Sequence, residues 1–289
     1  MIYKKCQTIA EIGCNHKGDI NIAKELILLA KQSGANVVKF QKRNNRELLP
    51  EEQYNSPHPN PINSYGETYG EHREFLEFSK EQNQELMDFC SKNDIMYSTS
   101  VWDVTSAREI SSLNPNLIKV PSASNTHYEM LKVLRDEYKG DVHVSFGMTT
   151  KLEQDKLVEF FEKTDQAKSR LIVYSCTSGY PVPFEDVCLL EILDIKDRFK
   201  NRVKDFGFSG HHLGISIDIA AYSLGVSWIE RHFTKDRTWK GTDHAASLEP
   251  AGFAKLTRDL NATFKALSYK SKEILDIESP QRDKLKYSK

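Results

Sequence analysis

Short runs of apolar and β-branched residues alternate along this chain with longer amphipathic stretches. Stretches such as NIAKELILLAKQSG and KLEQDKLVEFFEK repeat apolar residues at i, i+3, i+4 and i+7, the pattern of a helix with one buried face. Alternating strands and helices predict a parallel sheet with crossover helices. The eight predicted strands lie at residues 8–13, 36–41, 96–100, 117–122, 141–147, 170–177, 206–211 and 228–234. Eight such units favour a closed (β/α)8 TIM barrel over an open doubly wound sheet.

Two segments break this alternation. Residues 43–78 form a long, polar, Pro-rich and aromatic-rich insertion after the second strand, and a loop of this length is usually functional or mobile. The last residues are highly charged and predict a surface helix followed by an irregular end. We therefore expect one barrel domain over residues 1–270 and a charged tail over residues 271–289.

The composition excludes several classes of protein. With 40 Lys and Arg against 41 Asp and Glu, the 289 residues carry a formal charge of −1, so net charge does not favour binding to nucleic acid or to an anionic membrane. The chain has no apolar run of membrane-spanning length, and its start lacks the apolar region of a secretory signal. The five cysteines include no CxxC pair, which argues against a thiolate zinc site. We expect a cytoplasmic protein.

Polar residues collect at the C-terminal ends of the predicted strands, where a barrel builds its active site. Lys39 and Lys119 lie inside otherwise apolar strands, where an unpaired ammonium group is costly. Each lysine could instead lean out of the barrel mouth into water. Together with nearby serines they favour a convergent site for a phosphate or carboxylate. These serines are Ser122, Ser145, Ser178 and Ser209.

Histidines and carboxylates add candidate chemistry at the same end of the barrel. His211 and His232 end neighbouring strands and could share one divalent ion, or could be hydrogen-bonded structural or general-acid histidines. Glu11 is a carboxylate within a buried strand, which makes it a candidate acid, base or substrate ligand, or the partner of a barrel lysine. Asp243 lies in a loop, where a turn or helix-cap role is the usual alternative.

The ordered motifs of the chain resemble the N-acetylneuraminate (sialic acid) synthase family from about residue 8 to residue 268. The segments that carry the resemblance are AEIGCNHKGD, GANVVKFQ, YGEHREFLEFS, IKVPSAS, VSFGM, CTSGYPVPFEDVCL, FSGHHLG and IERHFTKDRTWKGTDHAASLEP. The resemblance implies a transferase of carbohydrate biosynthesis that condenses phosphoenolpyruvate with an N-acetylmannosamine-type aldose to a nonulosonic acid and releases phosphate. It also implies a (β/α)8 barrel, a divalent metal, Mn²⁺ or Mg²⁺, and a homodimer.

The resemblance also implies roles for individual residues. His211 and His232 would be the metal ligands. Glu11, Tyr180 and Asp243 would face the sugar and the reacting carbons. The shell around phosphoenolpyruvate would consist of Lys39, Thr99, Lys119, Ser122, Ser145, Ser178 and Ser209.

The chain departs from the family pattern at several positions, and these differences leave the identity of the sugar substrate undecided. Pro121, Ser122, Ala123 and Ser124 replace a Gly-Ser-Gly-acidic motif, so an acidic contact to the sugar is missing. The TWKGTDHAASLEP run resembles animal-type members that accept a 6-phosphorylated sugar. We expect no C-terminal antifreeze-like domain, which a separate polypeptide could supply. The alternatives are condensation to a 3-deoxy-octulosonate and a non-catalytic sugar-binding barrel subunit.

Overall fold

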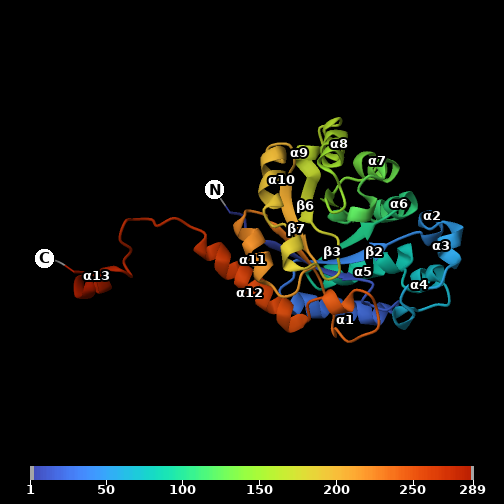
Figure 1. The fold of residues 1–289 in the computed structure, drawn as a ribbon, viewed down its shortest axis with the longest axis horizontal. Helices are drawn as coiled ribbons and strands as arrows, with labels where there is room; N and C mark the ends of the chain where they lie inside the picture. The colour runs from blue at the N-terminus through green and yellow to red at the C-terminus, as the bar shows by residue number, and fades with distance from the viewer. Residues whose placement is uncertain (1–2, 288–289) are drawn as a thin grey trace.

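Eight parallel strands close into a barrel in the computed structural model, which describes residues 3–287 (Figure 1). Each strand pairs with the next along the chain, and β8 pairs with β1 in the register Glu11 to His232. The (β/α)8 barrel predicted from the sequence is confirmed. The strands are β1 (Gln7–Gly13), β2 (Val37–Lys42), β3 (Met96–Val101), β4 (Leu117–Val120), β5 (Asp141–Ser145), β6 (Leu171–Cys176), β7 (Asp205–Gly210) and β8 (Trp228–His232).

Strand β4 is shorter than its apolar pattern suggested. It ends at Val120 because Pro121 has no amide hydrogen with which to continue the ladder. The next residues form the 3-10 turn η2 (Ser122–Ser124). Ser122 therefore reaches the barrel mouth from a turn and not from the strand that we expected.

Helices surround the barrel and cover the outer faces of the strands (Figure 1). Local caps set where they begin: Asp19 accepts hydrogen bonds from two amides of the first turn of α1, and Ser79 with Gln82 forms a capping box on α5. Their apolar faces pack against outward-pointing strand residues in two large clusters. The surrounding helices are α1 (Ile20–Gln32), α5 (Lys80–Lys92), α6 (Val104–Leu113), α7 (Tyr128–Asp136), α8 (Lys151–Glu162), α9 (Ala167–Arg170), α10 (Glu191–Phe199), α11 (Ser216–Ser223) and α12 (Pro250–Ala266).

The insertion after β2 is an ordered structure of short helices. A capping box between Thr68 and Glu71 begins its last helix. The insertion reaches across to the loop after β8, where the Tyr65 hydroxyl donates a hydrogen bond to the Lys240 carbonyl at 2.5 Å and the Gly241 amide donates to Asn63 Oδ1 at 3.2 Å. The elements of the insertion are α2 (Asn45–Leu48), α3 (Glu51–Asn55), η1 (Pro61–Asn63) and α4 (Tyr69–Phe75).

The loops after β6 and β8 carry two further 3-10 turns, η3 (Phe184–Asp186) and η4 (His244–Ala246). After α12 the chain leaves the barrel and ends in the exposed helix α13 (Ser279–Leu285), which lies away from the other elements (Figure 1). Within the described range of residues 3–287, no helix combines the length and the apolar character that crossing a bilayer requires.

The barrel interior is closed at its N-terminal end by an apolar and aromatic floor. His143 packs edge-on against Trp228 with ring centroids 4.7 Å apart, and its Nδ1 lies 2.7 Å from the Tyr174 hydroxyl. Burial lowers the pKa of His143 well below its usual value, so the floor is uncharged. The apolar members of this floor are Ile9, Val37, Leu117, Ile172 and Tyr174. The buried lysines Lys39 and Lys119 lie in the layer above, toward the mouth.

Candidate active site

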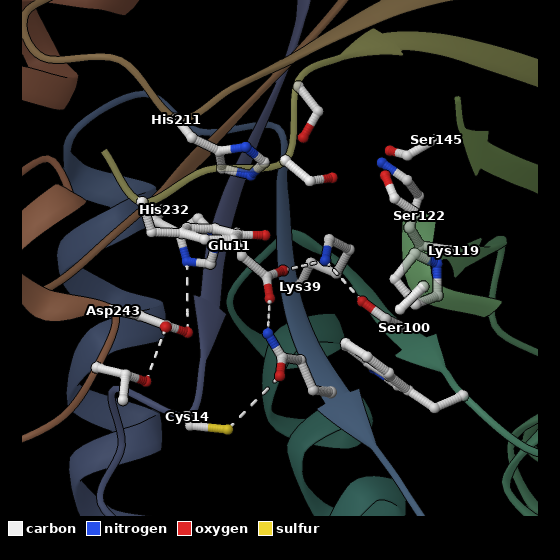
Figure 2. Close-up of a pocket in the computed structure, with 18 of the residues that line it drawn as sticks. Glu11, Cys14, Lys39, Ser100, Lys119, Ser122, Ser145, His211, His232 and Asp243 are labelled. Atoms are coloured by element: carbon white, nitrogen blue, oxygen red, sulfur yellow. Dashed lines mark hydrogen bonds and ion pairs between the residues drawn. The ribbon is translucent and has the colours of Figure 1, made fainter. Parts of the chain in front are cut away.

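A cavity of about 370 Å³ opens at the C-terminal ends of the strands. All eight strands contribute to its lining, together with α4 of the insertion and the loop after β8. Its volume lies within the range of small-molecule sites. In Figure 2, Glu11 and Lys39 lie between two groups of side chains, namely His211, His232 and Asp243 on one side and Lys119, Ser122 and Ser145 on the other.

Two lysines and two glutamates form a buried cluster at the bottom of the cavity. Lys39 forms an ion pair with Glu11 and donates a hydrogen bond to Ser100 Oγ at 2.8 Å. Lys119 Nζ lies 3.0 Å from Glu230 Oε2, and Glu230 Oε1 lies 3.8 Å from Lys39 Nζ. These charges are almost completely shielded from water, so each depends on its partner in the cluster. Glu230 thereby holds both ammonium groups in place.

The two carboxylates of this cluster differ in how readily they ionise. Burial raises the pKa of Glu11 to about 7, because loss of solvation outweighs the attraction of Lys39 and Glu230 adds like-charge repulsion. Burial also disfavours the Glu230 carboxylate, but Lys119 and Lys39 together lower the pKa of Glu230 to about 2. Burial lowers the pKa of Lys119. Glu230 is therefore a fixed anion, whereas Glu11 can take up or release a proton near neutral pH.

Serine hydroxyls line the side of the cavity next to Lys119. The Ser209 hydroxyl donates to Glu230 Oε1 at 3.2 Å, and Ser145 is buried at the end of β5. Gly147 lies between Ser122 and Ser178, and a Cβ atom at this position would be 2.5 Å from either Oγ atom. The missing side chain therefore leaves both hydroxyls open to the cavity. All four predicted serines line it, as do both predicted lysines.

Thr99 does not belong to this shell, contrary to our expectation. In the β2–β3 register Thr99 pairs with Phe40, whereas Lys39 pairs with Ser98 and Gln41 with Ser100. Because side chains alternate between the two faces of a strand, Thr99 faces the helices with Phe40. Ser100 takes its place at the cavity and accepts the hydrogen bond from Lys39.

His211 and His232 lie together at the cavity wall with ring centroids 5.5 Å apart. His211 Nδ1 is 3.0 Å from the Thr177 carbonyl, which can only accept a hydrogen bond from it. Burial lowers the pKa of His232, and its buried Nδ1 has no hydrogen-bond partner among residues 3–287. Two adjacent imidazoles could hold a divalent ion whose other positions stay open to small ligands.

This pair is not a closed metal site made of protein atoms alone. Among residues 3–287, no group of three or more His, Cys, Asp and Glu side chains is arranged to hold a metal ion. Asp243 Oδ2 lies 3.8 Å from His232 Nδ1, beyond hydrogen-bond distance but close enough for electrostatic attraction.

The remaining predicted residues, Tyr180 and Asp243, cap the cavity next to the histidines. The Tyr180 ring lies 4.4 Å from that of His211, centroid to centroid, and the side of Tyr180 that faces away from the cavity is open to solvent. Burial would raise the pKa of Asp243, but the neighbouring His232 and the hydrogen bond from the Thr242 hydroxyl at 2.9 Å lower it. Asp243 is therefore an anion beside the histidine pair.

Sequence reasoning gave no site role to several residues that line the cavity. Glu230 and Trp102 are two of them, and neither was among the site residues expected from the sequence. In the structure, the Arg43 guanidinium stacks over the Trp102 ring at 4.1 Å, and both line the cavity. Arg73 also lines it from α4. The sequence did contain a signal for Arg43. It directly follows β2, whose inward residues Lys39 and Gln41 are polar and line the cavity.

Comparison with known proteins places this site in a family. Residues 26–272 match the NeuB family. The chain is 36% identical to N-acetylneuraminate-9-phosphate synthase of Homo sapiens over 285 residues, which are 97% of this chain and 76% of that protein. It is 33% identical to N,N'-diacetyllegionaminic acid synthase of Campylobacter jejuni, over 91% of this chain and 78% of that protein. The crystal structure of N-acetylneuraminic acid synthetase from Leptospira borgpetersenii in complex with citrate superposes with a TM-score of 0.81 at 28% identity, covering 99% of this chain and 94% of that one.

Proposed function

The chain belongs to the NeuB family, and on this premise we propose that it condenses phosphoenolpyruvate with an N-acetylmannosamine-type aldose to form a nonulosonic acid. The names of its relatives support this activity, since they are synthases of N-acetylneuraminate 9-phosphate and of diacetyllegionaminic acid. The observation that carries the proposal is the buried pair of lysines facing a wall of serine hydroxyls at one end of the cavity. This arrangement suits an anion with both carboxylate and phosphate groups.

Phosphoenolpyruvate binds at the lysine end of the cavity. Lys39 and Lys119 neutralise its negative charge, while hydroxyls from the four strand ends β4 to β7 donate to its oxygens. The serines that line this end are Ser122, Ser145, Ser178 and Ser209, and Ser209 would have to turn its hydroxyl from Glu230 to donate to the ligand. Because the lysines are held by Glu230 before the ligand arrives, little reorganisation is needed on binding.

The aldose binds on the opposite side, between phosphoenolpyruvate and the residues Tyr180 and Asp243. The C3 carbon of phosphoenolpyruvate forms a bond with the aldehyde carbon, and the aldehyde oxygen becomes a hydroxyl. Water adds to C2 to give a tetrahedral phosphate ester, which collapses by cleaving the bond between C2 and the phosphate oxygen. One aldose, one phosphoenolpyruvate and one water thus yield one α-keto acid and one inorganic phosphate.

Glu11 moves the proton of the attacking water in this scheme. Its carboxyl group lies among Lys39, Gln41 and the cavity, with Gln41 Nε2 donating to Oε1 at 2.8 Å. A pKa near 7, raised by burial, suits a group that must accept a proton and later return it.

We also propose that His211 and His232 hold a divalent ion, Mn²⁺ or Mg²⁺. Such an ion would supply Lewis acidity that polarises the aldehyde oxygen. The support is the pair of adjacent imidazoles at the cavity wall and the buried, unpartnered Nδ1 of His232.

Substitution of His232 by glutamine is expected to weaken Mn²⁺ binding at least tenfold, since loss of even an outer-shell partner typically costs ten- to hundredfold. Titration calorimetry of Mn²⁺ with the purified protein measures this without any turnover. His127→Gln is the matched control, because His127 lies at the start of α7, outside the cavity lining. Equal Mn²⁺ affinity of the wild type and the His232 variant would refute the metal site.

Phosphate release from phosphoenolpyruvate tests the proposed function directly. With a panel of aldoses, we expect release that depends on an N-acetylmannosamine-type sugar, with a nine-carbon keto acid as product by mass spectrometry. Release with a five-carbon aldose phosphate alone would favour octulosonate synthesis. Sugar binding without phosphate release for any aldose, with Mn²⁺ present, would favour a non-catalytic barrel.

Homodimer formation, and an antifreeze-like domain supplied by a separate polypeptide, stay predictions from the resemblance. A cytoplasmic location likewise stays a prediction from the sequence.

A further inference from the structure

Strand β8 carries a charged side chain on the outside of the barrel, between two residues that face the cavity. Glu230 and His232 line the cavity, so the alternation of side chains along the strand turns Arg231 outward. Arg231 is nevertheless fully buried, because α11 and the loop after β7 cover it. Its side chain does not reach the substrates, and the proposed reaction gives it no role.

The Arg231 guanidinium forms a buried ion pair with Asp218 in the first turn of α11. Nη1 lies 2.5 Å from Asp218 Oδ2, whereas Asp218 Oδ1 and Arg231 Nε have no hydrogen-bond partner among residues 3–287. Burial of two charges costs solvation, and their attraction compensates for it only with good geometry and further hydrogen bonds. A contribution to the stability of the barrel is therefore a weak explanation for this pair.

The other contacts of Arg231 hold the loop that follows β7. Nη1 donates to the Gly214 carbonyl at 2.7 Å, and Nη2 donates to the His212 carbonyl at 2.5 Å. The His212 ring lies against the same group, with Nε2 at 3.0 Å from Nη1. Because the guanidinium is planar and rigid, it fixes the directions of both carbonyls at once.

This loop begins with His211, at the point where the pairing of β7 with β8 ends. The last pair of the β7–β8 register is Gly210 with Arg231. His211 directly follows Gly210, and His232 directly follows Arg231. Arg231 therefore joins the segment of one histidine to the strand of the other, just where the backbone ladder stops. Figure 2 shows the two imidazoles close together at the cavity wall.

We propose that Arg231 is a positioning residue that sets the placement of His211 relative to His232, so that both imidazoles share one divalent ion. The inference rests on the part of the proposed function that assigns such an ion to these histidines. A metal-binding arrangement has to be held to within about 0.5 Å by supporting contacts. Arg231 supplies this support through the backbone of residues 212–214, and Asp218 holds the guanidinium from α11.

Titration calorimetry with Mn²⁺ tests this inference without turnover. Arg231→Met combined with Asp218→Asn removes both charges, so that no unpaired charge stays in the interior. We expect this double variant to bind Mn²⁺ about ten- to hundredfold more weakly than the wild type, the usual effect of losing an outer-shell partner. Arg231→Lys keeps the ion pair with Asp218 but cannot reach both loop carbonyls, so its Mn²⁺ affinity should lie between the two.

Arg170→Met is the matched control for the arginine replacement. The Arg170 guanidinium also holds backbone carbonyls, since it donates to those of Gly140 and Leu134 at 2.8 and 3.0 Å. It does so at the start of β6, at the N-terminal end of the barrel and outside the cavity lining. This variant should have a lower melting temperature than the wild type and the same Mn²⁺ affinity.

Two further measurements separate positioning from a general loss of structure. The melting temperature of the double variant should lie closer to that of the wild type than the melting temperature of Arg231→Met alone, while its Mn²⁺ affinity stays low. Its affinity for phosphoenolpyruvate, measured by calorimetry without metal, should be unchanged. An unchanged Mn²⁺ affinity, or a parallel loss of phosphoenolpyruvate binding, would overturn the assignment.

The His232→Gln variant separates failure of this inference from failure of the proposed function. If His232→Gln weakens Mn²⁺ binding and the Arg231 variants do not, only this inference is wrong. If His232→Gln leaves Mn²⁺ binding unchanged, the metal site is wrong and this inference with it. Mn²⁺ binding that depends on Arg231, without phosphate release from any aldose, would support the inference and count against the condensation reaction.

Discussion

Replacement of Lys119 by methionine is expected to lower kcat/KM for phosphoenolpyruvate about a thousandfold or more. Lys119 Nζ is buried 3.0 Å from Glu230, next to the serine wall. Loss of a single preorganised donor from an active site typically costs a hundred- to thousandfold, and this donor also carries a full charge. Steady-state kinetics of phosphate release measure the loss.

The same substitution removes one of the two lysines that neutralise Glu230. The loss of stability must therefore be measured separately from the loss of activity. Breaking a buried ion pair typically costs about 3–5 kcal/mol in the free energy of unfolding. The double variant Lys119→Met, Glu230→Gln removes the unpaired charge and should recover much of this stability without recovering activity. Lys204→Met is the control for the lysine replacement, because Lys204 pairs with Asp141 far from the cavity lining. An active Lys119 variant would contradict the placement of phosphoenolpyruvate.

Substitution of Glu11 by glutamine is expected to lower kcat a hundred- to thousandfold, with little change in KM for phosphoenolpyruvate. The amide keeps the shape of the side chain and its contact with Gln41 but cannot take up a proton. Loss of general acid-base catalysis typically costs a hundred- to ten-thousandfold. Near-normal turnover in the Glu11→Gln variant would contradict the role of Glu11. The control is Glu25→Gln, because Glu25 forms an exposed ion pair with Lys235.

The pH dependence gives a second readout for Glu11. Because burial raises its pKa to about 7, kcat/KM should fall as the pH drops below about 7 and the carboxylate takes up a proton. The Gln variant should lose this acid limb. The folded pKa lies above the ordinary value of 4.5, so the folded state favours the protonated form. Its contribution to stability is present below about pH 4.5 and lost as the pH rises through 7.

The eight strands could be predicted because each buries one or both faces and is bounded by clear helical periodicity. The lysines could be predicted for the same reason, since a charged residue inside an apolar strand needs a special partner. Their partners could not all be predicted, because Glu230 meets Lys119 only when the barrel closes and brings β8 within reach of β4.

The predictions failed where a shift of one residue in strand register, or the packing of one short helix, decides which side chains face the cavity. The family resemblance implied that Thr99 belongs to the phosphoenolpyruvate shell, but the pairing of Thr99 with Phe40 turns it outward. The insertion was expected as a loop because helices of four to seven residues leave no detectable period. Arg73 gained no specific role for that reason, since its place at the cavity depends on how α4 packs.

The aromatic floor beneath the lysines closes the barrel at its N-terminal end. His143, Tyr174 and Trp228 fill the bottom of the barrel. Substrates and products therefore have to enter and leave through the mouth at the C-terminal ends of the strands. In the proposed reaction, phosphoenolpyruvate and the aldose therefore enter, and the keto acid and inorganic phosphate leave, by this same opening.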